Sequence, residues 1–285
     1  MLKTDLYDDL PFSECEYRLF SRRVQALLGI RLSEYKPDQM RRRLTTIAQQ
    51  TRCGSFMAYL EAIQSSEQIK NAFLNHITIN VTELVRNADL FDVLAKKILP
   101  DLISGPSRAG LNIWSAGCSY GAEAYTVSMI LNEMLPVPVF KIRGTDVDLA
   151  TLAKANLAIF TRADMAGVSP ERKKRFFLEA SEEIYVPTPM LRKNVIFSPH
   201  DLLSDDYQSN SYDLILCRNV VIYFNDQARE RIYQNFYKAL KPGGFLFVGG
   251  TERLNSVSAK NFDSICPFFY RTKKTELGKM SNLAA

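Results

Sequence analysis

The chain has 285 residues, of which 46% are hydrophobic and 24% charged, the balance of an ordinary soluble globular protein. No apolar run approaches the roughly 18 residues of a membrane-spanning helix, and the acidic, polar start is no secretory signal, so we expect a cytoplasmic protein without membrane insertion. The net charge of +5 is too mild to demand a nucleic-acid partner, and the five cysteines form no CxxC pair, so neither a metal site nor a disulfide is expected.

Helices are expected from about residue 12 to residue 75. Apolar side chains recur every three or four residues over 17–28 and over 37–50, the pattern of amphipathic helices. Ser55 fits the N-cap of a third helix, and a fourth helical segment follows it. The pattern predicts a helical N-terminal domain that covers residues 1–78.

Basic residues crowd this first part of the chain. Arg41, Arg42 and Arg43 stand together on the second expected helix, on or beside the side opposite Met40 and Leu44. A basic face of this kind suits an acidic partner. We therefore treat the three arginines as candidate partner-binding residues.

After Ala88 short apolar strands alternate with helices. This alternation predicts an α/β fold with a mostly parallel sheet covered on both faces. A closing antiparallel strand is expected near the end, and a polar, disordered tail over 273–285. The stretch 160–193 fits neither pattern and is expected to form a small insertion within a second domain, residues 79–272. The expected parallel strands lie at about 111–115, 139–145, 194–198, 212–217 and 244–249.

The most informative stretch runs from Ile113 to Asp146. It contains a strand, a turn bracketed by Gly117 and Gly121, a helix from about Ala122, and a second strand that ends in an acid. This arrangement binds adenosine-type cofactors. The glycines let the backbone approach a ligand because they have no Cβ, and the acid at the strand tip can accept both ribose hydroxyl hydrogens.

Glu123, in the first turn of the expected helix, narrows the choice of cofactor. The turn matches neither GxGxxG nor GxxxxGK[ST], the motifs that bind diphosphates. A carboxylate at this position repels phosphate and favours a cationic group, which points away from NAD and ATP and toward S-adenosylmethionine. The alternative is a glutamate that only stabilises the helix dipole.

Two further polar groups are candidates for the same pocket. Asn80, Thr82 and Arg86 follow an apolar run and are placed on the lip of the pocket, although such a cluster can also cap a helix. Asp201 and Leu202 follow the strand near 194–198, where the carboxylate and the backbone N–H could bind adenine. The neighbouring histidine is given no catalytic role.

A third group, Arg218, Asn219 and Tyr223, follows the strand at 212–217. Ligands in open parallel sheets bind beyond the carboxyl ends of the strands, so these side chains should reach the mouth of the same crevice. The alternative for Tyr223 is packing against the sheet.

Taken together, the chain resembles the chemotaxis receptor glutamate methyltransferases of the CheR family over roughly residues 12–271. The order and spacing of the blocks are far more specific than any single one. The resemblance implies a small helical domain followed by a class I S-adenosylmethionine-dependent, Rossmann-like methyltransferase domain that carries a small β insertion. The blocks are Asn80 to Arg86, Trp114 to Glu123, Thr145-Asp146, Cys217 to Phe224 and Lys241-Pro242-Gly243-Gly244.

The resemblance also implies roles. Arg86 and Tyr223 would lie nearest the transferred methyl, and the basic helix would meet the cytoplasmic methylation helices of chemoreceptors. The implied reaction converts receptor glutamates to methyl esters and leaves S-adenosyl-L-homocysteine. The implied cofactor-binding residues are Asn80, Thr82, Arg86, Gly117, Glu123, Asp146, Asp201, Leu202, Arg218 and Asn219.

Several positions depart from the family pattern. Leu84 and Val85 replace two aromatic residues, and the segment around Glu123 lacks one acid and a proline. The insertion is short and lacks a glycine-rich loop, so no tether to a receptor tail peptide is expected. Two rival functions stay open: a non-catalytic signalling relative that binds S-adenosylmethionine, and a class I methyltransferase acting on RNA or a small molecule.

Overall fold

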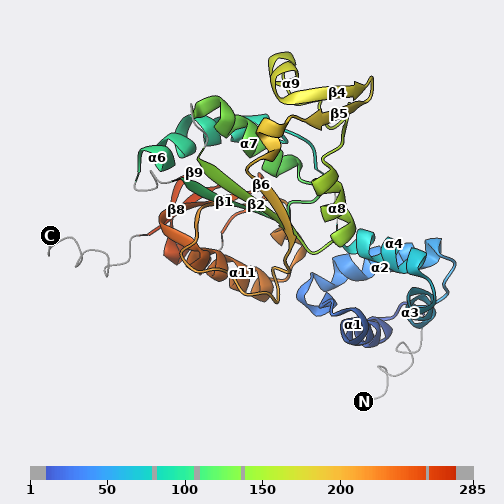
Figure 1. Cartoon of the computed structure of the whole chain (residues 1–285). Coiled ribbons are helices and arrows are strands. Elements are labelled where there is room, and N and C mark those ends of the chain that lie inside the picture. The colour runs from blue at the N-terminus through green and yellow to red at the C-terminus, as the bar shows by residue number, and fades with distance from the viewer. Residues whose placement is uncertain (1–10, 79–81, 106–109, 136–138, 255–256, 274–285) are drawn as a thin grey trace. The chain divides into compact units, whose positions relative to one another are not determined.

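The computed structural model describes residues 11–78, 82–105, 110–135, 139–254 and 257–273 (Figure 1). Its contacts divide the chain into two compact units: residues 1–80 with 223–229, and residues 81–222 with 230–285. The expected tail falls, from residue 274 onward, outside the described residues. The boundaries expected at residues 78 and 272 stay a prediction.

The first unit is helical. Serine side chains begin three of its helices, since Ser13, Ser55 and Ser66 each accept a backbone N–H from the first turn, and the predicted N-cap at Ser55 is confirmed. Aromatic rings fill its core, with Phe20 and Phe56 fully buried. The elements are α1 (Glu14–Leu28), η1 (Leu32–Glu34), α2 (Pro37–Gln50), α3 (Phe56–Ser65) and α4 (Glu67–Ile77).

A distant segment, residues 223–229, completes this helical unit. The backbone N–H of Lys36 donates to the carbonyl of Tyr223 across 2.9 Å. The rings of Tyr35 and Phe224 meet edge to face with centroids 4.9 Å apart. Hydrophobic periodicity does not predict that this segment joins the helical unit, because it reports which face of an element is apolar and not which unit buries that face.

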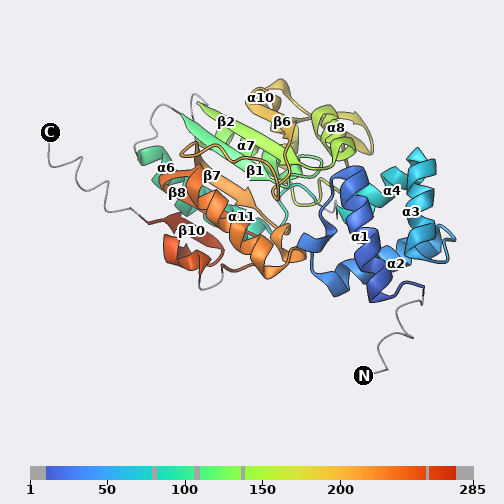
Figure 2. The same cartoon turned by 90° about the horizontal axis from the view of Figure 1, so that it is seen from below.

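The second unit is built on a seven-stranded sheet in the order β6-β2-β1-β7-β8-β10-β9 (Figure 2). The first five strands in this order are parallel, as predicted. The prediction of a single closing strand was wrong, because two antiparallel strands form a hairpin there. The hairpin turns through Phe268, whose φ is +70°. The strands are β1 (Leu111–Ala116), β2 (Phe140–Asp146), β6 (Val195–Pro199), β7 (Tyr212–Cys217), β8 (Leu240–Val248), β9 (Phe262–Cys266) and β10 (Phe269–Thr272).

Helices cover both faces of this sheet, as predicted. Neighbouring residues of a strand point to opposite faces. Ile113 joins the apolar cluster that contains Val127 of α7, whereas the ring of Trp114 packs edge to face on Phe236 of α11. Figure 1 accordingly shows α7 and α11 on opposite sides of the sheet. The elements are α5 (Ala88–Val93), η2 (Leu94–Ile98), α6 (Leu99–Ser104), α7 (Ala122–Met134), α8 (Leu149–Leu157), η3 (Val221–Tyr223), α11 (Asp226–Ala239) and η4 (Ser258–Asn261).

The stretch that fitted neither pattern is a small β insertion, which confirms the expectation (Figure 1). Three antiparallel strands form it in the order β3-β5-β4. The elements are β3 (Phe160–Thr161), α9 (Pro170–Phe176), β4 (Phe177–Ser181), β5 (Ile184–Pro187) and α10 (Pro189–Arg192).

The topology of the large sheet brings together one set of loops. The five parallel strands end at the same edge, and β1 lies between β2 and β7, so chain connections leave it in both directions. In open parallel sheets, ligands bind where connections diverge in this way, beyond the carboxyl ends of the strands. Within the described ranges, none of the helices combines the length and apolar character that crossing a bilayer demands.

Candidate functional site

The bend after β1 is tied to the end of β2. Gly117 has a φ of +74°, and its N–H donates to the carbonyl of Thr145 at 2.8 Å. A Cβ at this position would lie 2.5 Å from Cγ2 of Val220, so the bend requires glycine both for its conformation and for space. Two residues on, the N–H of Ser119 donates to Oδ2 of Asp146 at 2.9 Å.

Asp146 stands at the tip of β2, where the sequence placed it. Its side chain is nearly buried, and its Oδ1 accepts the N–H of Asp148 at 3.1 Å. Burial raises the pKa of this carboxyl, while the two backbone donors oppose the shift. Its carboxylate oxygens can accept further hydrogens, so the ribose role stays a prediction that the geometry allows.

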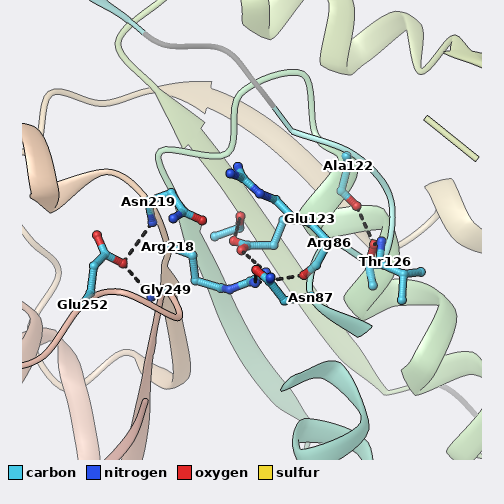
Figure 3. A network of polar contacts seen from close by, with 11 residues as sticks. Arg86, Asn87, Ala122, Glu123, Thr126, Arg218, Asn219, Gly249 and Glu252 are labelled. Carbon is cyan, nitrogen blue, oxygen red and sulfur yellow. Dashed lines mark hydrogen bonds and ion pairs between the residues drawn. The ribbon is translucent and has the colours of Figure 1, made fainter. Parts of the chain in front are cut away.

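Glu123 forms a buried ion pair that the sequence did not reveal (Figure 3). Its Oε1 accepts the hydroxyl of Ser115 at 2.6 Å, and its Oε2 lies 3.5 Å from Nη1 of Arg218. Burial raises the pKa of Glu123 and lowers that of Arg218. The guanidinium of Arg218 already compensates part of the charge of Glu123, and the predicted contact of Glu123 with a cationic cofactor group stays a prediction.

The guanidinium of Arg218 also holds the loop that carries Arg86. Its Nη2 donates to the carbonyl of Arg86 and to Oδ1 of Asn87, both at 2.9 Å. Its carbon Cζ lies 4.9 Å and 4.8 Å from the ring centroids of Phe91 and Phe247. Arg218 therefore acts first as a brace within the protein, although it was predicted only as a cofactor contact. Its Nε is buried and finds no hydrogen-bond partner among the described residues.

The loop around Arg86 is conformationally strained. Val85 and Asn87, on either side of it, have φ angles of +60° and +61°. The N–H of Val85 donates to Oγ1 of Thr126 on α7 at 3.0 Å, and that hydroxyl donates to the carbonyl of Ala122 (Figure 3). A β-branched residue in this region is uncommon and is maintained only by its surroundings.

Two further residues, Thr82 and Asn80, were predicted to belong to this loop, and the structure describes only the first. The hydroxyl of Tyr120 lies within hydrogen-bond distance of two acceptors, the carbonyl of Thr82 and Oδ1 of Asp164 at the start of the insertion. Asn80 lies outside the described residues. Thr82 is therefore tied to the glycine turn, and its contact with a cofactor stays a prediction.

Asn219, after β7, is held by an acid that had been given no role. Asn219 has a φ of +59°, and its N–H donates to Oε2 of Glu252 at 2.9 Å. The N–H of Gly249, at the end of β8, donates to the same oxygen (Figure 3). Glu252 is buried, and burial raises its pKa. Its Oε1 is buried without a hydrogen-bond partner in the described part of the chain.

Sequence reasoning missed both Thr126 and Glu252. The signal for Thr126 was weak: a β-branched hydroxyl residue inside an apolar helix, which is a poor helix former and needs an acceptor or donor nearby. The signal for Glu252 was an acid directly after a buried strand at the same edge of the sheet.

The turn after β6 reaches the same edge. The N–H of His200 donates to the carbonyl of Asp146 at 3.1 Å. Asp201 uses both oxygens locally, since Oδ1 accepts the N–H of Leu203 at 2.8 Å and Oδ2 the hydroxyl of Ser204. Leu202 is buried. The predicted adenine contacts of this turn stay predictions, and the carboxylate of Asp201 is a turn-forming group in this structure.

The remaining candidates belong to the helical unit. Arg42 is exposed and Arg41 half-buried, as a partner-binding face requires. Arg43 differs, because its guanidinium donates to the carbonyl of His76 and lies 5.8 Å from the ring centroid of Tyr223. These contacts involve Arg43 in the internal packing of α2 against α4 and Tyr223, and its part in partner binding stays a prediction. The predicted place of Tyr223 beside the methyl stays a prediction.

The residues that line the bends fit S-adenosylmethionine. Carboxylates suit its ammonium and ribose hydroxyls, and guanidinium groups suit its carboxylate. Within the described ranges, Nε of Arg218 and Oε1 of Glu252 are buried polar atoms without a hydrogen-bond partner. Arg218 interacts electrostatically with the acids Glu123 and Glu252, and Glu123 also interacts with Arg86. Among the described residues, no group of three or more His, Cys, Asp or Glu side chains is placed to hold a metal ion.

Comparison with known proteins agrees with this geometry. Residues 80–266 match the family described as "CheR methyltransferase, SAM binding domain", and residues 16–78 match "CheR methyltransferase, all-alpha domain". A chemotaxis protein methyltransferase of Listeria monocytogenes is 33% identical over 92% of this chain and 98% of its own length. Chemotaxis protein methyltransferase 1 of Pseudomonas aeruginosa is 29% identical over 86% of this chain and 92% of its own.

A solved structure, a TehB-like SAM-dependent methyltransferase from Corynebacterium glutamicum, has a TM-score of 0.38 at 16% identity and covers 66% of this chain and 96% of its own. The family matches cover most of the chain, and the buried acid–base cluster lies within the residues matched to the S-adenosylmethionine-binding domain. The chain therefore belongs to the CheR methyltransferases, with S-adenosylmethionine as its cofactor.

Proposed function

We propose that this protein methylates glutamate side chains on the cytoplasmic helices of chemoreceptors and gives glutamate methyl esters. The observation that carries the proposal is the match of the chain, in order, to both the helical and the cofactor-binding parts of one methyltransferase family. The relatives named above are called chemotaxis protein methyltransferases, and they span nearly the full length of this chain.

Methyl transfer requires the protein mainly to align the reacting groups and to exclude water from them. Bound S-adenosylmethionine supplies an electrophilic methyl group on a sulfonium. A glutamate with a pKa of about 4.3 is ionised at neutral pH, so no general base is required. Burial raises the pKa of the Cys118 and Cys217 thiols, which disfavours the thiolates that could compete as nucleophiles.

Arg86 is the residue we assign to the incoming carboxylate. A guanidinium can orient a carboxylate with paired N–H donors, and a rigid loop limits how far it moves. The Arg218 brace and the Thr126 contact both fix the backbone beside Arg86. Tyr223, by resemblance, would hold the carboxylate or the methyl through its hydroxyl.

Receptor recognition is assigned to the helical unit. Arg41 and Arg42 on α2 offer positive charge to the acidic methylation helices of a receptor, and a cytoplasmic location follows from that partner. The small insertion, whose sheet has three short strands, is proposed to make no tether to a receptor tail peptide. Calorimetry with a receptor tail peptide should show no binding, and micromolar affinity would contradict this part of the proposal.

The test uses the full chain, radiolabelled methyl donor and the membrane fraction of the source cells. Alkali releases volatile methanol from glutamate methyl esters but not from methylated amides or nucleic acids. With the natural protein, we expect alkali-labile label in receptors. Arg86→Ala should strongly reduce this label, although the variant without cofactor should still fold. Label in RNA or in small molecules would favour a class I methyltransferase that acts on those substrates. Tight cofactor binding without any methyl transfer would favour a non-catalytic signalling relative.

A further inference from the structure

Three bends among the predicted site residues share one construction. Each contains a non-glycine residue with a positive φ, between +51° and +60°, whose backbone N–H donates to a buried side chain of a neighbouring element. Such backbone conformations persist only where the surrounding structure imposes them. The three donors are Val85, Ser119 and Asn219, and their respective acceptors are Thr126, Asp146 and Glu252.

Asp146 already has a candidate cofactor role, but the other two acceptors have none. We propose that Thr126 and Glu252 are positioning residues that hold the bends carrying Arg86 and Asn219 in the shape that methyl transfer needs. The proposal deepens the function proposed above and rests on it for its kinetic consequences. Its structural consequences can be measured without cofactor or substrate.

Thr126 is suited to this task because its hydroxyl both accepts and donates a hydrogen bond. It accepts the N–H of Val85 at 3.0 Å and donates its own hydrogen to the carbonyl of Ala122 at 2.8 Å. The side chain is fully buried, so water cannot replace it as an acceptor. Without it, the N–H of Val85 would be left unsatisfied in an already strained conformation, and the next residue, Arg86, would lose its fixed backbone.

Glu252 performs the same task for Asn219 through a shared oxygen. Its Oε2 accepts from both Asn219 and Gly249, which joins the bend after β7 to the end of β8. A Cβ on Gly249 would lie 2.5 Å from that oxygen and 2.9 Å from the nitrogen of Asn219, so the backbone closes tightly around the carboxyl group. Burial raises the pKa of Glu252, while the backbone N–H donors of Asn219 and Gly249 oppose that shift because they stabilise the carboxylate.

The central test compares Thr126→Val with Thr126→Ser. Valine keeps the shape but has no acceptor, whereas serine keeps the hydroxyl. Ser128→Ala is the matched control, because Ser128 lies on the same helix and loses a buried hydrogen bond to the carbonyl of Leu191 without touching the Arg86 loop. Hydrogen exchange of a peptide covering 82–90, measured by mass spectrometry on the cofactor-free protein, is the first readout.

We expect Thr126→Val to raise exchange in this peptide about tenfold, the change that a loss of roughly 1.4 kcal/mol of local stability produces. Thr126→Ser and Ser128→Ala should leave it unchanged. Equal exchange in Thr126→Val and Ser128→Ala would overturn the proposal for Thr126, and so would a serine variant as open as the valine variant. These outcomes hold even if receptors prove not to be the substrate, so failure here is distinct from failure of the proposed function.

Kinetics supply the second readout. If Thr126 acts through Arg86, Thr126→Val lowers kcat about tenfold in the natural background and has no further effect on Arg86→Ala. Additive losses in the double variant would contradict positioning. For Glu252, glutamine keeps a carbonyl acceptor and should retain most cofactor affinity, whereas alanine should weaken it at least tenfold; equal losses in Glu252→Gln and Glu252→Ala would overturn its assignment.

Discussion

The Nη2 atom of Arg218 donates to the backbone carbonyl of Arg86 at 2.9 Å, although 132 residues separate them in the chain. The same guanidinium is paired with Glu123 and is almost fully buried. One side chain thus compensates a buried acid and fixes the loop that carries the proposed substrate-binding arginine. Its removal should affect folding and binding together.

Arg218→Met is expected to destabilise the protein by about 3–5 kcal/mol, because it leaves the carboxylate of Glu123 buried without its partner. Adding Glu123→Gln should recover part of that loss, since no uncompensated charge then remains. Urea unfolding followed by circular dichroism measures both. A double variant no more stable than Arg218→Met alone would show that the uncompensated charge of Glu123 does not cause the loss of stability.

Gly117→Ala should weaken S-adenosylmethionine binding at least tenfold, as measured by calorimetry. Its Cβ would lie 2.5 Å from Val220, and the positive φ adds strain, at about 1–2 kcal/mol. Gly243→Ala is the matched control: its φ is +81°, and a Cβ there meets no atom within 4 Å among the described residues. Similar losses of affinity in both variants would mean that backbone strain alone, and not the contact with Val220, is responsible.

Gly249→Ala tests the junction at Glu252 from the backbone side. The added Cβ would press on the carboxyl oxygen and on the N–H of Asn219, so we expect a stability loss of about 1–3 kcal/mol and weaker cofactor binding. Gly250→Ala, one residue later, meets only Cδ1 of Leu90 at 3.8 Å and should behave like the natural protein. Equal tolerance of both substitutions would contradict the tight closure around Glu252.

Acid should destabilise the second unit through His200. Burial lowers its pKa below the value of about 6.5 in an unfolded chain, so the folded state favours the neutral ring. The stabilisation is fully present above pH 6.5 and is lost as the pH falls through that value and the lower folded pKa. Urea unfolding monitored by Trp114, the sole tryptophan, whose ring centroid lies 5.1 Å from the imidazole, should show a smaller loss between pH 7 and pH 5 in His200→Gln.

His76→Gln serves as the control for that experiment, because His76 lies in the other unit and its pKa is also lowered by burial. The tryptophan signal should keep its natural pH dependence in this variant. An unchanged acid response in His200→Gln would assign the sensitivity to the carboxyl groups instead.

The sequence allowed the sheet and the glycine bend to be predicted because both depend on local patterns. The strands follow apolar runs, and Gly117 follows from a turn that no other residue can form. The pairing of Glu123 with Arg218, 95 residues apart, has no local signal, and neither has the contact between Val85 and Thr126. These contacts depend on which face of α7 meets which loop, and the tertiary fold alone decides that.

The inward turn of Arg43 illustrates the same limit. Three consecutive arginines look alike in a sequence, yet consecutive helical residues are about 100° apart, so they cannot share one environment. Arg43 falls on the side that packs on α4, whereas Arg42 stays exposed. Charge counts along a helix therefore overstate the number of residues that can meet a partner.

Residues 223–229 belong to the helical unit although the chain on both sides of them belongs to the other. An exchange of the proposed receptor-binding unit between relatives must therefore transplant two stretches of chain, not one. A chimera joined only near residue 80 would set the foreign helices against a native Tyr223–Phe224 segment that was fitted to Tyr35 and Lys36. Residues 1–80 and 223–229 would have to be transplanted together to exchange the proposed receptor preference and leave the cofactor-binding unit intact.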